Sequence, residues 1–497
     1  MSPAEYPNVL VIHADQHRAD CIGAYGNAQI RTPHLDALAA DGVVYTDHFC
    51  SYPACTPSRY SLLCGQQVHQ HLCWNNQSTL PPGIETFPGI MRRAGYSTEA
   101  IGKMHFTPTY LDVGFSRMHL AEQDGDGRLE DDYHDYLCRQ GLLDAVDLYD
   151  QRAEYRAAAS PGYWESFGAQ ASDLPVEHHS TTYITDEAER SVEQWSGGGN
   201  LLMVGYIKPH HPFDPPEPYA SLYDPDLLEL LPGYTDEVPE DERAAESGYF
   251  DFSRLDEAAL RRVMAMYYGT ISQIDDGVGR LIAMLKSKGL YERTIIVYTS
   301  DHGEYLGFHH LLLKGHRMYD PLVRIPLIVK PAGRGVVAGE PASCSRLSSN
   351  TDIAAHLLEA CGLEPAPGMS RAGLRPDRPG RSSVIAEHLF PSDGRVDYMI
   401  RTQRYKLLLT GGFDDARLYD LAEDPLELCD LSAESEHAAL REELTRLLCG
   451  ELLFRSPSRV HRDHLAPTAA PLPPPELARR RRRLRAWHAQ QTGIVPR

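Results

Sequence analysis

The chain has 497 residues, of which 42% are hydrophobic, and its formal net charge is −21 at pH 7. A chain of this length can bury a large core, so we expect one large domain and a smaller one. The excess of Asp and Glu argues against a nucleic-acid-binding surface, and no hydrophobic run is long enough to span a membrane.

The N-terminal residues contain no basic region followed by an apolar stretch and a cleavage site, so we predict no secretory signal. The ten cysteines form no Cys-x-x-Cys framework and are typical of reduced, buried thiols. Both observations favour a cytoplasmic protein.

The first predicted element is a buried strand. Residues 8–14 are continuously apolar and run into Asp15 and Gln16, a pattern typical of a strand covered on both faces. Ligands bind at the carboxyl ends of such strands, so both side chains are candidate ligands. The alternative for Asp15 is a helix cap. Residues 34–41 predict a short helix.

The stretch Cys55-Thr56-Pro57-Ser58-Arg59 follows a predicted strand over residues 43–49. Pro is favoured in the first turn of a helix. A helix that starts here places a potential nucleophile, Cys55, beside a cation, Arg59, with little backbone freedom between them. The alternative is a buried, unreactive Cys at a helix start.

Residues 95–105 (GYSTEAIGKMH) predict a strand that ends in two donors. Lys103 and His105 lie two positions apart, so we expect their side chains on the same face. The alternative is a surface Lys beside an unrelated His.

Residues 106–180 are acidic, aromatic and weakly periodic, which predicts an insertion of helices and loops. Residues 124–127 (DGDG) resemble the start of a calcium loop, but Leu129 occupies the position at which an EF-hand turn needs Gly. We interpret this stretch as a solvated turn.

A helix over residues 181–195 and a buried strand over residues 201–207 are predicted next. The strand leads into a proline-rich loop that carries His210 and His211. Adjacent side chains of an extended segment point apart, so at most one of the two should face a site.

A long helix over residues 255–288 precedes an apolar strand over residues 294–299. Asp301 and His302 follow this strand, which repeats the arrangement of polar residues after the first strand. Lys314 lies in the next loop and is a further candidate cation.

Near-continuously apolar strands that alternate with helices indicate an α/β fold with a large doubly wound mixed sheet flanked by helices. We assign residues 1–382 to this domain. From residue 383 the pattern changes to short strands and turns, which predicts a small α+β domain over residues 383–460.

Residues 461–497 are predicted to form a proline-rich tether and a basic C-terminal tail. The run Arg479–Arg483 begins a segment that we expect to be helical. Its charge predicts either a solvated face or a contact with a second copy of the chain, because the acidic remainder disfavours nucleic-acid binding.

Together these segments resemble the type I, formylglycine-dependent sulfatase family of the alkaline phosphatase superfamily. In that family the nucleophile is a formylglycine made from the Cys of a CxPSR motif, which falls here on residues 55–59. A second signature, GYxTxxxGKxH, falls on residues 95–105. The remaining family elements fall on His210, Asp301, His302 and Lys314.

The resemblance implies an alkaline-phosphatase-like fold and hydrolysis of a sulfate monoester, after a formylglycine-generating enzyme has converted Cys55. Hard oxygen ligands are suited to Ca²⁺, or alternatively to Mg²⁺ or Mn²⁺. The candidate metal ligands are Asp15, Gln16, Cys55, Asp301 and His302.

The remaining roles implied by the resemblance concern the sulfate group and the protons. We expect Arg59, Lys103 and Lys314 to hold the sulfate oxygens. His210 is the candidate acid for the leaving oxygen, and His105 is the candidate base for the second hydroxyl of the formylglycine hydrate.

The chain departs from the family pattern at two places. After the nucleophile helix the family usually has Leu-Thr-Gly-Arg, whereas residues 63–66 are Leu-Cys-Gly-Gln. Many sulfatases have Asp and Asn at the positions of Gln16 and His302. The residues present here are similar to those of choline-sulfatase, iduronate-sulfatase and phosphonate-hydrolase relatives.

Two alternative functions follow from the same residues. One is a phosphonate monoester or phosphodiester hydrolase, and the other is a non-catalytic sulfate-ester-binding protein with unmodified Cys55. The acidic segments 106–180 and 214–255 argue against a polysulfated polymer, so we expect a small sugar sulfate or an aryl sulfate as substrate.

Overall fold

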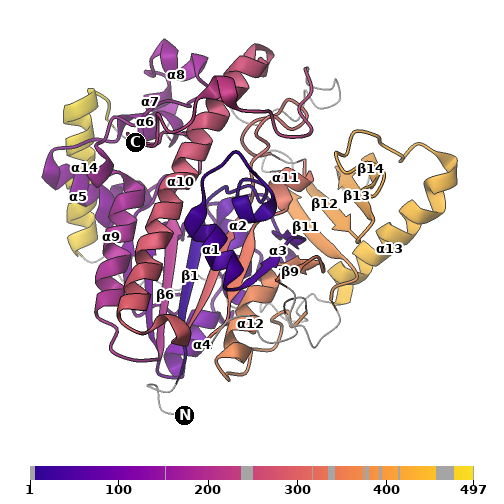
Figure 1. Ribbon diagram of the computed structural model, residues 1–497, viewed down its shortest axis with the longest axis horizontal. Coiled ribbons are helices and arrows are strands. Elements are labelled where there is room, and N and C mark those ends of the chain that lie inside the picture. The colour runs from indigo at the N-terminus through magenta and orange to yellow at the C-terminus, as the bar shows by residue number, and fades with distance from the viewer. Residues whose placement is uncertain are drawn as a thin grey trace.

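A computed structural model describes residues 6–495, except residues 152, 237–249, 316, 334–341, 373, 375–379, 391–393, 412–414 and 455–474. Its centre is an eight-stranded sheet with the order β5-β4-β6-β1-β7-β8-β2-β9 (Figure 1). The strands are β1 (Asn8–Ala14), β2 (Val43–Tyr45), β4 (Ser97–Gly102), β5 (Arg117–Leu120), β6 (Asn200–Tyr206), β7 (Thr294–Ser300), β8 (Leu327–Lys330) and β9 (Ser343–Cys344).

Strand β1 lies in the middle of this sheet and is fully buried. It pairs in parallel with β6 on one side and with β7 on the other. Strand β8 is antiparallel to both β7 and β2, so the sheet is mixed. The predicted class is confirmed, since the near-continuous apolar runs form strands that are covered on both faces.

Helices cover both faces of the sheet, as the alternating side chains of β1 require. Leu10 and Ile12 pack in one core with α1 (Pro33–Ala40), α9 (Ser180–Glu193) and α10 (Glu257–Ser287). Val9 and Val11 face a second core with α2 (Cys55–Cys64), α4 (Phe87–Arg93) and α12 (Thr351–Ala360). Asp256 is the N-cap of the long helix α10, and its side chain accepts a hydrogen bond from the backbone N of Ala259.

The predicted strand over residues 43–49 is wrong as a single element. It is interrupted at Thr46 and Asp47, so β2 belongs to the large sheet, whereas β3 (His48–Phe49) pairs with β10 (Ser348–Ser349). The two-stranded pair of β3 and β10 thus separates from the large sheet after Tyr45, and the chain then continues to the start of α2.

The predicted insertion contains α5 (Asp132–Gln140), α6 (Ala145–Gln151), α7 (Ala153–Arg156) and α8 (Pro161–Glu165). It also supplies the edge strand β5, which pairs in parallel with β4. The sequence pattern did not predict this strand, because only four residues form it and three of them are not fully buried.

A second sheet follows the large domain. The antiparallel strands β11 (Val384–Leu389), β12 (Val396–Arg401), β13 (Tyr405–Thr410) and β14 (Asp415–Asp420) pack against α13 (Ala438–Phe454). Lys406 Nζ and Arg401 Nη1 reach the carboxylate of Asp320 in the large domain at 3.0 and 2.7 Å. The predicted small α+β unit is therefore confirmed, and buried ion pairs tie it to the main sheet.

The C-terminal helix α14 (Pro475–Thr492) lies on the far side of the molecule from α13 and runs beside α5 (Figure 1). Arg480 Nη1 lies 3.0 Å from Asp132 Oδ1, and Arg483 pairs with Asp135. The expected helix is present. Its arginines pair with acidic residues of the same chain, yet Arg483 is 54% exposed, as expected for a solvated face. Contact with a second copy of the chain stays a prediction. The predicted tether lies almost wholly outside the described residues.

Among the described residues, no helix combines the length and the apolar character needed to cross a membrane.

Candidate active site

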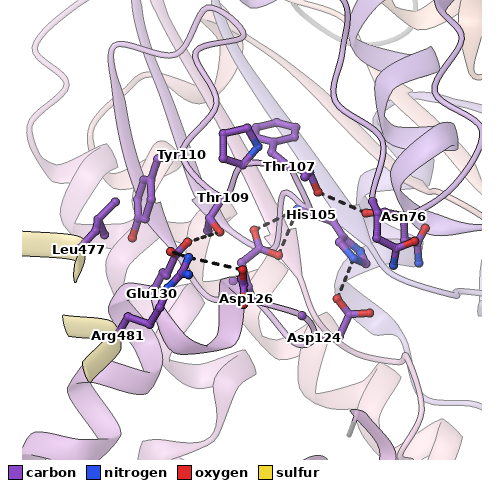
Figure 2. Close-up of a pocket in the computed structure, with 16 residues that line it drawn as sticks. Asn76, His105, Thr107, Thr109, Tyr110, Asp124, Asp126, Glu130, Leu477 and Arg481 are labelled. Carbon is purple, nitrogen blue, oxygen red and sulfur yellow. Dashed lines mark hydrogen bonds and ion pairs between the residues drawn. The ribbon is translucent and has the colours of Figure 1, made fainter. Parts of the chain in front are cut away.

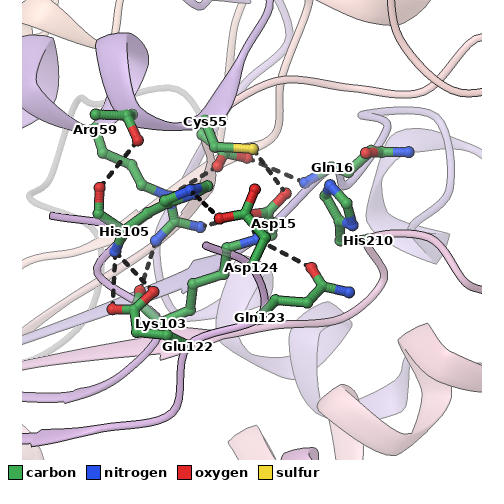
Figure 3. A network of polar contacts seen from close by, with 12 residues as sticks. Asp15, Gln16, Cys55, Arg59, Lys103, His105, Glu122, Gln123, Asp124 and His210 are labelled. Atoms are coloured by element: carbon green, nitrogen blue, oxygen red, sulfur yellow. Dashed lines mark hydrogen bonds and ion pairs between the residues drawn. The ribbon is translucent and has the colours of Figure 1, made fainter. Parts of the chain in front are cut away.

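The site lies where β1 and β7 end and α2 begins (Figure 3). Ala14 and Ser300 are partners in the parallel register, so Asp15 and Asp301 leave the sheet side by side. With Cys55 and His302 they form a fully buried group whose ligand atoms lie within 4.8 Å of one another. The sheet topology thus brings together the carboxylates that sequence analysis placed at two separate strand ends.

Arg59 lies one helical turn after Cys55 and connects both carboxylates. Its Nη2 donates to Asp15 Oδ2 and its Nε donates to Asp301 Oδ2, each at 2.9 Å. Its Nη1 donates to the backbone oxygen of Lys103 at 2.6 Å. All three nitrogens therefore engage protein oxygens, which holds both carboxylates in position. The predicted contact of Arg59 with sulfate stays a prediction.

Two ammonium groups flank Cys55 and the carboxylate beside it. Lys314 Nζ lies 3.2 Å from Cys55 Sγ and 3.2 Å from Gln16 Oε1. Lys103 Nζ lies 2.8 Å from Asp15 Oδ2 and 3.1 Å from Gln123 Oε1. Burial and Asp15 oppose ionisation of Cys55, but Lys314 and Lys103 hold the pKa of its thiol well below the usual range. The N-terminus of α2 adds a favourable dipole for an anion at this position.

His105 follows β4 rather than ending it, and its backbone has a positive φ of 59°. Its Nε2 lies 3.0 Å from Asp124 Oδ1, while its Nδ1 is buried without a hydrogen-bond partner among the described residues. Burial opposes protonation, but Asp124 raises the pKa of His105 to about 10. Residues 124–127 form the predicted turn, with Gly125 and Asp126 exposed. Asp124 has a further role that was not predicted, since it orients and charges a candidate catalytic side chain.

His210 and His211 point apart, as predicted for adjacent residues. His210 Nε2 lies 2.6 Å from Lys314 Nζ, and its Nδ1 donates to the backbone oxygen of His211 at 2.6 Å. His211 Nδ1 instead lies 2.6 Å from Asp150 Oδ1. Burial and then Lys314 lower the pKa of His210, so its Nε2 is an uncharged acceptor.

Gln16 and His302 present ligand atoms to the same centre. Gln16 Nε2 donates to the carboxylate of Glu304, which leaves Oε1 on the side of Lys314. His302 Nδ1 donates to the backbone oxygen of Gly303 at 2.9 Å, so its Nε2 is the ring nitrogen that faces the centre, 3.4 Å from Cys55 Sγ. Carboxylate and amide oxygens with one imidazole nitrogen are a donor set that suits a divalent cation.

Sequence analysis missed three residues that support this arrangement. Gln123 connects Lys103 to Asp147, and Asn350 donates to Ser58 Oγ at 2.9 Å at the start of α2. Glu304 accepts from Gln16 and from the backbone N of Leu306. All three lie in or beside loops, where no periodic pattern marks them.

A cavity of about 340 Å³ opens onto these groups. Its wall includes Lys103, His105, His210 and Lys314, together with Asp150, Gln151 and Arg156. The cations and histidines predicted from separate motifs therefore line a single cavity.

Comparison with known proteins agrees with this geometry. Residues 7–363 match the family model Sulfatase, and residues 307–451 match the model described as N-sulphoglucosamine sulphohydrolase, C-terminal. An arylsulfatase of Clostridium perfringens is 28% identical and aligns over 90% of this chain and 94% of its own length.

Two further similar proteins are not named as sulfatases. The multifunctional alkaline phosphatase superfamily protein PehA of Trinickia caryophylli is 28% identical over 87% of this chain and 92% of its own. The structure of a phosphonate monoester hydrolase from Silicibacter pomeroyi superposes with a TM-score of 0.72 at 25% identity, over 90% of this chain and 95% of that one. Since the Sulfatase model spans most of the chain, the protein belongs to the sulfatase family of sulfuric ester hydrolases.

Proposed function

We propose that this protein hydrolyses a sulfate monoester of a sugar or another small alcohol, with Cys55 converted to formylglycine by a maturation enzyme. The observation that carries the proposal is the approach of Lys314 Nζ to 3.2 Å from Cys55 Sγ at the N-terminus of α2. A buried side chain between ammonium groups and a helix N-terminus is suited to holding an anion at the reacting atom.

The proposal includes a divalent cation, Ca²⁺ or alternatively Mg²⁺ or Mn²⁺, held by Asp15, Gln16, Asp301, His302 and the modified Cys55. The four-residue group of ligand atoms within 4.8 Å supports this assignment. Such an ion, when bound, supplies positive charge that offsets the sulfate oxygens and lowers the pKa of the attacking hydroxyl.

Lys103 and Lys314 are the proposed anchors for the sulfate oxygens, because each presents its ammonium group beside Cys55 or Asp15. Arg59 pairs with the carboxylates of Asp15 and Asp301 and so holds them in place. A donor of this kind typically contributes on the order of 10²–10³ in rate.

The two histidines exchange the roles that sequence analysis gave them. His105, with its pKa raised to about 10, is protonated at neutral pH and is the better proton donor for the leaving oxygen. His210 Nε2 is neutral and accepts a hydrogen bond from Lys314, so it is the better proton acceptor. We therefore propose His105 as the acid and His210 as the base.

A second candidate is hydrolysis of phosphonate monoesters or phosphodiesters, which the likeness to PehA and to the phosphonate monoester hydrolase supports. Turnover of 4-nitrophenyl sulfate, choline sulfate, monosulfated sugars and phenyl phosphonate esters distinguishes the candidates. We expect sulfate release from at least one sulfate ester at a higher kcat/KM than any phosphonate ester. Exclusive turnover of phosphonate esters would overturn the proposal.

A further inference from the structure

Figure 2 shows a second cavity, of about 400 Å³. It shares lining residues with the 340 Å³ cavity described above, which is called the reaction cavity here. Asn76, His105 and Asp124 line both cavities, so the acid–histidine pair forms their common wall. If the alcohol part of a bound ester extends past His105, it therefore enters the second cavity. Its volume falls within the range of sites that hold small ligands.

The outer wall of the second cavity comes from the C-terminal helix α14. Leu477 and Arg481 lie one helical turn apart and both face the cavity (Figure 2). Arg481 pairs with Glu130 and lies 3.5 Å from Asp126, which fixes the helix against the opposite wall. This helix lies beyond both matched family models, which end at residues 363 and 451.

The charges on the wall decide which ligand it suits. The lining residues of the cavity include the carboxylates of Glu122, Asp124, Asp126 and Glu130 but only two cationic side chains, those of His105 and Arg481. Those two cations are already paired with carboxylates. A second sulfate or carboxylate group would therefore face a net negative wall.

Neutral polar groups fit the wall better. Carboxylate oxygens accept hydrogen bonds from hydroxyl groups, and the hydroxyl of Thr109 lies in the wall, where it donates to Glu130 Oε2 at 2.7 Å. The rings of Phe106 and Tyr110 give apolar surface for the faces of a ligand ring.

We infer that this cavity is a second subsite, which holds an uncharged, hydroxyl-rich ring of the alcohol part of the substrate, and that α14 forms its specificity wall. The inference rests on the proposed sulfate-ester hydrolysis and extends it from a single ring to an alcohol of at least two rings.

The test compares kcat/KM for monosulfated disaccharides with kcat/KM for 4-nitrophenyl sulfate, which is too small to reach the second cavity. Leu477→Trp narrows the cavity from α14, and Gln77→Trp narrows it from an exposed lining position outside α14. Each variant should lower the ratio of disaccharide to aryl-sulfate turnover by roughly tenfold or more, as expected when a pocket loses room for a ring. Ala486→Trp, on the exposed face of α14, is the control and should not change the ratio.

The charge of the second ring of the substrate provides a second test. The wild-type protein should prefer monosulfated lactose isomers over monosulfated disaccharides whose second ring is a uronic acid. Equal ratios in wild type and both tryptophan variants, a preference for the uronic acid, or no turnover of any disaccharide would overturn the inference. If the wild type hydrolysed neither 4-nitrophenyl sulfate nor any monosaccharide sulfate, the proposed function itself would be overturned.

Discussion

The ammonium group of Lys314 lies 3.2 Å from the sulfur of Cys55, although 259 positions separate the two residues in the chain. Glu304 shapes the intervening loop by accepting hydrogen bonds from the backbone N of Leu306 and Leu313. The chain thus closes a long loop to place one cation at the start of α2. Ordering this loop costs conformational entropy. Its result is an ammonium group held beside the reacting side chain, where it can bind an anion.

Cys55 should act through its modified form rather than through its thiol. Expression with a maturation enzyme should lower the intact mass by about 18 Da, because oxidation of the CH2–SH group to an aldehyde removes one sulfur and two hydrogens and adds one oxygen. Cys55→Ala should fold but lose activity. Mass spectrometry and sulfate release check both points. Substantial activity of Cys55→Ala would mean that the nucleophile lies elsewhere.

Activity should require a divalent cation. Exhaustive chelation should abolish turnover, because the carboxylates of Asp15 and Asp301 would then repel the sulfate. Addition of Ca²⁺, Mg²⁺ or Mn²⁺ should restore it, and the most effective ion identifies the cofactor. Full activity of protein shown to be metal-free by elemental analysis would contradict the assignment.

Arg59→Gln should destabilise the metal-depleted protein by about 3–5 kcal/mol, because it removes the guanidinium that pairs with both buried carboxylates and leaves Lys103 beside Asp15 only. Arg59 is 1% exposed and pairs with both Asp15 and Asp301. Arg92→Gln breaks an exposed pair with Asp112 and should cost less than about 1 kcal/mol. Denaturant unfolding compares the two variants, and equal costs would show that Arg59 does not stabilise the carboxylates.

Asp124→Asn should move the alkaline limit of activity to lower pH. In the wild type the pKa of His105 is about 10, so the imidazolium persists until the pH rises through that value. Without the carboxylate, burial lowers the pKa and the proton is lost at a lower pH. The pH profile of kcat/KM for 4-nitrophenyl sulfate checks the shift, with Asp112→Asn at an exposed position as control. An unchanged alkaline limb would remove His105 as the acid.

Lys103 should favour sulfate over phosphonate esters. A sulfate monoester has three non-bridging oxygens for the cations, whereas a phosphonate ester replaces one of them by carbon and leaves a buried charge unpaired. We expect the wild type to favour sulfate by about a hundredfold or more in kcat/KM, and Lys103→Ala to narrow the gap by slowing sulfate turnover more. Equal turnover of phenyl phosphonate esters by the wild type would support the second candidate.

The apolar pattern of the sequence predicts the central strands of the sheet and places candidate site residues at their ends. Continuous apolar runs such as residues 8–14 and 294–299 can only be buried on both faces, so they predicted the central strands within a residue or two. Polar residues directly after such strands, Asp15 and Asp301 among them, are placed by chain continuity alone. Their grouping followed from the parallel order of the strands.

What each polar side chain contacts depends on how distant segments of the chain pack together. Arg59 turned out to bind two carboxylates, and Asp124 turned out to charge His105, because both contacts join segments whose separation no local pattern encodes. The docking of α14 depends on ion pairs with an insertion more than three hundred residues earlier. Periodicity reports which face of an element is buried, whereas long-range pairing of charges depends on how the faces meet.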